Sequence, residues 1–196
     1  MRKRIRSFAV FLGAGLFLSA GALPALAADS GNSAGGWIFA WAEGTASAAT
    51  CNTNQTCISG SGKGLSKSLF GVPAGSGEES HAGGNGALGR YDFAANLTLD
   101  SGNASPNGFG GTCSAAGGTL TLSHRSDSLV VDVQGAACAL GASATLSALN
   151  GSYVVDGAHS AGAFAGASGT GAFNAALDAN ATPIALSLVL NGNLQP

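Results

Sequence analysis

The sequence predicts an all-β protein, in the form of an antiparallel closed β-barrel of about eight strands. Apolar and polar residues alternate with period two along most of the chain, as in strands that bury one face. Glycines and hydroxyl residues interrupt every window in which a helical apolar stripe would form. Only 9% of the residues are charged, so few charges guard exposed strand edges, and closure removes those edges. A β-sandwich is the alternative architecture.

The strands follow one another between turn signals. The first is predicted at residues 37–41 and the second at 91–100. Residues 119–123 and 129–134 form a predicted hairpin with its turn at 125–127. A further alternating segment runs from 144 to 155 and contains Asn150-Gly151, a dipeptide typical of two-residue hairpin turns. The last predicted strand covers 184–190, and long loops are expected at 71–86 and 101–111.

The N-terminus is typical of an export signal. Four basic residues lie within the first six, an apolar run follows from Phe8 to Leu18, and Ala25-Leu26-Ala27 supplies the small residues that a signal peptidase requires. We therefore predict a signal peptide at residues 1–27, a single secreted domain at 28–196, and no transmembrane segment after cleavage.

Cleavage would change the charge of the protein. The domain after residue 27 keeps four positive and ten negative side chains, a formal net charge of −6, against −2 for the whole chain. Such a chain repels polyanions, so we predict no nucleic-acid partner. The loop residues Glu78, Glu79 and His81 are more typical of solvated side chains than of a metal site, and the sequence indicates no metal and no cofactor.

Four cysteines in an exported chain favour two disulfides. Three pairings are open from the sequence. We prefer Cys51 with Cys57, which closes a short polar loop, and Cys113 with Cys138, which flank two predicted strands and would join neighbouring strand ends.

Residues 160–173 read SAGAFAGASGTGAF and follow a predicted strand at 152–157. This stretch resembles the glycine-rich strand pair of the allene oxide cyclase-like and dirigent-like barrels, which include small secreted bacterial proteins. Ser160-Ala161-Gly162 departs from their usual Gly-Thr-Gly. The resemblance implies an eight-stranded barrel with phenylalanine inside, and it carries over no catalytic residue.

The candidate ligand-binding residues are aromatic. Trp37, Phe39 and Trp41, joined by Tyr91 and Phe93, are predicted to form an apolar inward face that either fills the barrel or lines a pocket.

Catalytic signals are weak. The segment around Ser160 resembles a nucleophile elbow only superficially, since no histidine follows it, and His159 reads as an exposed turn residue. The aspartates are spread through strands and turns, and the sequence does not select a pair for acid–base work (Asp92, Asp100, Asp132, Asp156 and Asp178).

Three functions remain open. The first is a secreted, non-catalytic barrel that binds a small apolar ligand or a cell-surface partner. The second is a structural or self-associating cell-surface protein, and the third is an enzyme of cyclase or isomerase type. A lack of catalytic residues places the enzyme last, although the sequence leaves enzymatic activity open.

Overall fold

The computed structural model describes residues 36–70, 89–108, 110–140 and 145–195. The predicted signal peptide, the loop at 71–86 and its residues Glu78, Glu79 and His81 lie outside these ranges. The described elements are β1 (Gly36–Asn52), β2 (Gln55–Phe70), β3 (Arg90–Pro106), β4 (Thr112–His124), β5 (Asp127–Ala139), β6 (Leu146–Val155), η1 (Gly162–Phe164), β7 (Thr170–Asp178) and β8 (Ile184–Leu194).

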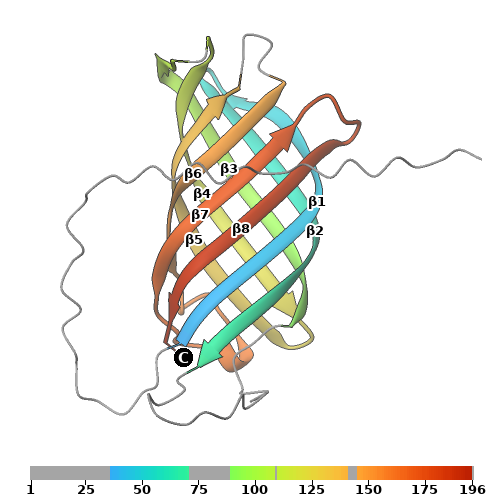
Figure 1. Cartoon of the computed structure of the whole chain (residues 1–196), viewed down its shortest axis with the longest axis vertical. Coiled ribbons are helices and arrows are strands. Elements are labelled where there is room, and N and C mark those ends of the chain that lie inside the picture. The colour runs from blue at the N-terminus through green and yellow to red at the C-terminus, as the bar shows by residue number, and fades with distance from the viewer. Residues whose placement is uncertain (1–35, 71–88, 109, 141–144, 196) are drawn as a thin grey trace, which may run out of the picture. The chain divides into compact units, whose positions relative to one another are not determined.

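The eight strands form a closed antiparallel barrel, as predicted, and not a sandwich. Each strand pairs with its neighbours in sequence, and β8 pairs with β1 to close the sheet (Figure 1). The strands have 9 to 17 residues, longer than the short strands that the sequence suggested. Part of the difference lies in the loop predicted at 101–111, because β3 continues to Pro106 and β4 begins at Thr112.

The inward face of the barrel is a continuous apolar core. It consists mainly of leucine, valine and alanine with a few aromatic rings, including Phe93, Phe164 and Phe173. Phe164 belongs to η1, in the segment between β6 and β7, and is only 1% exposed. Figure 1 shows this segment at the same end of the barrel as the C-terminus. η1 contacts β5 at this end, where Ala161 and Ser128 exchange backbone hydrogen bonds.

Two tyrosine rings depend on glycines in neighbouring strands. A Cβ on Gly64 of β2 would meet the ring of Tyr91, and a Cβ on Gly192 of β8 would lie 2.6 Å from the hydroxyl of Tyr153. Both tyrosines are buried, and neither hydroxyl has a hydrogen-bond partner among the described residues. The absence of side chains on these glycines therefore creates the space that the rings fill.

The dipeptide Asn150-Gly151 is not a turn, contrary to the prediction. It lies inside β6, where Gly151 pairs with Gly135 of β5. A Cβ on Gly151 would meet the carbonyl oxygen of Gln134, so the glycine allows two strands to approach closely. The hairpin predicted at 119–134 is confirmed: β4 and β5 pair from His124 and Asp127 onward. The last strand is also confirmed and extends to Leu194.

Both predicted disulfides are present, Cys51–Cys57 and Cys113–Cys138. The first lies at the tip of the β1–β2 hairpin, and the second joins directly paired residues at the start of β4 and the end of β5. In an antiparallel meander these positions share one end of the barrel, opposite the end where β1 begins. The disulfides are typical of an oxidising, extracellular compartment. Within the described ranges, no helix is long and apolar enough to cross a membrane.

Candidate functional site

The predicted aromatic face is divided between the two sides of the barrel wall. Tyr91 and Phe93 are each 3% exposed and belong to the core, as predicted. The prediction is wrong for the residues of β1: Trp37, Phe39 and Trp41 are 50%, 45% and 39% exposed. Their neighbours on the strand face inward instead, namely Ile38, Ala40 and Ala42.

The barrel interior explains this orientation. The rings of Tyr91, Tyr153 and Phe173 reach inward from other strands, so the wall at β1 contributes side chains as small as alanine. Close packing leaves no volume for two further indole rings.

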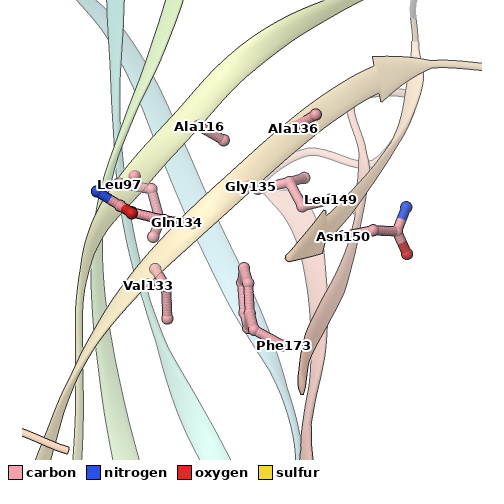
Figure 2. A pocket seen from close by; sticks show the side chains of 10 residues that line it. Leu97, Ala116, Val133, Gln134, Gly135, Ala136, Leu149, Asn150 and Phe173 are labelled. Atoms are coloured by element: carbon pink, nitrogen blue, oxygen red, sulfur yellow. The ribbon is translucent and has the colours of Figure 1, made fainter. Parts of the chain in front are cut away.

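The interior shows no space for a ligand in the region drawn in Figure 2. Leu97, Val133, Leu149 and Phe173 surround a void that does not hold even a water molecule. The aromatic pocket that the sequence suggested is therefore not formed there. The open depressions lie on the outer surface of the barrel.

The exposed aromatic residues form a line along β1. Successive outward side chains on a strand are spaced by about 6.6–6.8 Å, so Trp37, Phe39 and Trp41 span about 13 Å. We call these three residues the aromatic row. On the β8 side, Trp37 pairs with Asn193 and Phe39 pairs with Asn191. The side-chain oxygen of Asn193 accepts a hydrogen bond from the backbone of Thr170 at 2.8 Å, which leaves the amide NH₂ group of this exposed residue at the surface.

A second line of outward residues starts at Trp41 and crosses the strands. Trp41 pairs with Leu65 of β2, and Leu65 pairs with Arg90 of β3. Asp92 pairs with Ser123, which is the last pair of β3 and β4 toward this end, and Arg125 follows in the β4–β5 turn. Arg90 and Arg125 line the same depression. We call Trp41, Leu65, Arg90 and Arg125 the transverse row.

The transverse row lies in an open depression of about 490 Å³, which His124 and Lys63 also line. Three of the four cations that follow residue 27 therefore meet at one place, on a chain whose acidic residues outnumber them. Lys63 is neutralised by Asp92, with 3.0 Å between Nζ and Oδ1, and it pairs across the strands with Glu43. Neither arginine forms an ion pair with any residue in the described ranges.

Another open depression, of about 560 Å³, lies over β3, β4 and β5. Its lining contains small residues with Thr98, Asp100 and Gln134, and it has no aromatic or cationic side chain. The depression at the transverse row is therefore the one that combines an apolar surface with charge.

The histidine and serine considered for catalysis lie in the turn after β6. Asp156 Oδ2 and His159 Nδ1 are 2.6 Å apart, and this hydrogen bond lowers the pKa of the Asp156 carboxyl. His159 is an exposed turn residue, as expected. The Ser160 hydroxyl donates to the backbone oxygen of Asp156 and accepts from the Val130 N–H, so it is held by the fold.

The carboxylates also serve local structure. Asp100 and Asp178 accept hydrogen bonds from backbone groups two residues further on, and Asp92 binds Lys63. Among the described residues no hydrogen bond joins two aspartates, and no group of three or more histidine, cysteine or acidic residues has the arrangement of a metal site. Asp92, Asp100 and Asp178 thus have local partners, and exposed cationic side chains gather with Trp41 in the depression at the transverse row.

The comparisons give no relative. No known protein family, no curated protein and no solved structure matches the chain. The resemblance of residues 160–173 to the allene oxide cyclase-like barrels thus stays a prediction from sequence.

Sequence reasoning missed Leu65, Arg90, His124 and Arg125. Leu65, Arg90 and the adjacent pair His124-Arg125 are far apart in the chain and become neighbours only in the assembled sheet. One signal was available: cations are so rare after residue 27 that three of them in one depression are a departure from an even distribution.

Proposed function

We propose that this protein is a secreted, non-catalytic barrel that binds a carbohydrate chain of the cell surface on the outer face of β1. The observation that carries the proposal is the exposed aromatic row. Seven large hydrophobic side chains are exposed in the described ranges, and four of them are contiguous here: Trp37, Phe39, Trp41 and Leu65. Exposed apolar surface of this kind is typical of an interaction site.

The chemistry of the row favours a sugar. The faces of pyranose rings carry C–H groups that pack against the π-face of an indole or phenyl ring. Sugar hydroxyls then bond to a side-chain amide beside the rings, that of the exposed Asn193. A row of three rings along one strand offers successive platforms to a linear chain.

Two functions that the sequence left open, binding of a small apolar ligand and enzymatic activity, receive less support. A small apolar ligand would need space inside the barrel, and the void around Phe173 does not admit water. A catalytic role would need reactive groups near the aromatic row, where the described acidic residues Glu43 and Asp92 both lie across the strands from Lys63 and Asp92 is bound to it. The leader sequence and the two disulfides support secretion.

The test is affinity gel electrophoresis of the secreted protein in gels that contain neutral or acidic polysaccharides. We expect retardation by at least one polymer, and loss of retardation in Trp37→Ala and Trp41→Ala. Val154→Ala is the matched control, because Val154 is 55% exposed but lies on β6, away from the row.

The same variants separate binding from self-association. If no polysaccharide retards the protein, and light scattering shows an oligomer that Trp37→Ala dissociates, then the aromatic row joins copies of the chain and the carbohydrate proposal is wrong.

A further inference from the structure

We infer that Arg90 and Arg125 form a carboxylate-binding site, which makes the surface selective for acidic sugar chains such as those containing uronic acids. The net charge of −6 after residue 27 repels a polyanion at long range, so this selectivity depends on the two guanidinium groups at short range. This inference rests on the proposed function, and it adds the charge of the partner. The two arginines continue the transverse row from Trp41, so one chain can stack on the indole and reach both guanidinium groups.

Arg90 and Arg125 place two positive charges in one depression. Like charges that lie close together repel each other. The nearby carboxylates are engaged elsewhere. Asp92 binds Lys63 at 3.0 Å, and Asp127 accepts a hydrogen bond from the backbone of Ala163 at 3.1 Å. A bound carboxylate would remove the repulsion, since guanidinium groups bind carboxylates in a bidentate manner.

The backbone conformation of Arg125 also distinguishes this position. Arg125 has φ of 57°, the only non-glycine residue with positive φ in the described ranges. Glycine adopts this conformation without steric conflict, and hairpin turns commonly use glycine, asparagine or aspartate there. The turn after β4 instead holds a long cation in a strained conformation beside the depression. Strain that the fold does not need is characteristic of functional positions.

Lys63, the third cation of the depression, differs from the two arginines in its partners. Lys63 lies between Glu43 and Asp92, so its charge is balanced within the protein. The two arginines have no ion-pair partner among the described residues, and an anion bound from a ligand would balance their charge. An acidic polysaccharide supplies such an anion together with the ring that Trp41 stacks upon.

The experiment compares polygalacturonate and alginate with their esterified forms, which have the same backbone but masked carboxylates. Binding of the secreted protein is measured by affinity electrophoresis and calorimetry at low and high salt. We expect the free acids to bind at least tenfold more tightly than the esters, with the preference falling as salt screens the charges. Arg90→Gln and Arg125→Gly should remove the preference and retain the weaker binding of the esters.

Val154→Ala is again the matched control, because Val154 is exposed on β6 and lies outside the depression, and it should keep the preference for acids. Equal binding of acids and esters by the unmodified protein would overturn this inference and leave the proposed carbohydrate binding intact. A preference that survives in the Arg90→Gln/Arg125→Gly double variant would also overturn it. If neither form of either polymer binds, this inference is wrong, whereas the proposed function is refuted only if the neutral polysaccharides also fail to retard the protein.

Discussion

The two tyrosines of the chain provide a direct test of the barrel interior at alkaline pH. Tyr91 and Tyr153 are the only tyrosines, so the tyrosinate absorption band reports these two residues alone. Burial raises the pKa of Tyr153 from 10.0 to about 12, and burial also raises the pKa of Tyr91. We expect both hydroxyls to stay protonated in the folded protein well above the pH at which an exposed tyrosine ionises.

The shift has a consequence for stability. A group whose pKa is higher in the folded state contributes stability in full below its unfolded pKa, and loses it as pH rises through the folded pKa. At about pH 11 an unfolded tyrosine is about tenfold more ionised than Tyr153, which lowers the free energy of unfolding by about 1.4 kcal/mol. At still higher pH, the loss due to Tyr153 approaches about 2.7 kcal/mol, from a shift of about two pKa units.

The assay is urea unfolding at about pH 8 and about pH 11, for the natural sequence and for Tyr91→Phe, Tyr153→Phe and the double variant. Phenylalanine keeps the ring against the neighbouring glycines and removes a hydroxyl that has no partner among the described residues. At about pH 8 the variants should therefore be as stable as the natural sequence or slightly more stable. The double variant should lose less stability on the change to about pH 11, while lysine titration affects both proteins equally.

Two results would refute this reasoning. Tyrosinate absorption that develops near pH 10.0 while the protein remains folded would show that the hydroxyls are not buried as described. Alkaline destabilisation of equal size in the natural sequence and the double variant would show that other groups cause it.

Three further outcomes are expected from urea unfolding. Replacing Cys113 and Cys138 by serine should lower stability by about 3.5 kcal/mol, against about 2.2 kcal/mol for the disulfide of the β1–β2 hairpin, because the closed loops span 25 and 6 residues; equal losses would contradict this account. Arg125→Gly should raise stability by up to about 1 kcal/mol by relieving positive φ, and a loss would show that the turn needs arginine. Gly192→Ala should cost about 1–3 kcal/mol through contact with β7, whereas Gly117→Ala, with its nearest neighbour 3.4 Å away, should change little; similar values would refute the close strand approach.

The sequence predicted six segments of strand because the pleat imposes a period of two on a strand with one buried face. It gave no strand for β2 (Gln55–Phe70), where serine, glycine and lysine interrupt the apolar pattern, and the alternation gave none for β7 (Thr170–Asp178). It did not predict which face of β1 is buried. Residues 37–42 are apolar on both faces, with Trp37, Phe39 and Trp41 on one and isoleucine and alanines on the other. Size favoured burial of the larger rings, but the interior volume is taken by residues of other strands, such as Tyr153.

The error at Asn150-Gly151 has a related cause. A turn and a close strand contact both need a residue without a side chain, and local sequence does not distinguish them. The partner that decides between them is Gly135, which lies in β5 and meets Gly151 only in the assembled sheet.

The candidate site could not be predicted from local sequence patterns either, because its residues meet only in the assembled sheet. Trp41, Leu65, Arg90 and Arg125 belong to four different segments, and strand pairing brings them to one depression. The disulfides could be predicted because cysteines in an exported chain have few alternative roles.

The closing seam of the barrel has a consequence for biosynthesis. Seven of the eight strand pairs join neighbours in sequence, and the pair of β1 with β8 alone joins the two ends of the described barrel. The aromatic row lies on β1, at this seam. Synthesis from the N-terminus makes β1 first and β8 last, so the surface has its final form only after β8 is complete. Partly exported or truncated chains would leave β1 with an open edge, and recognition of the partner would thereby be restricted to molecules whose synthesis is complete.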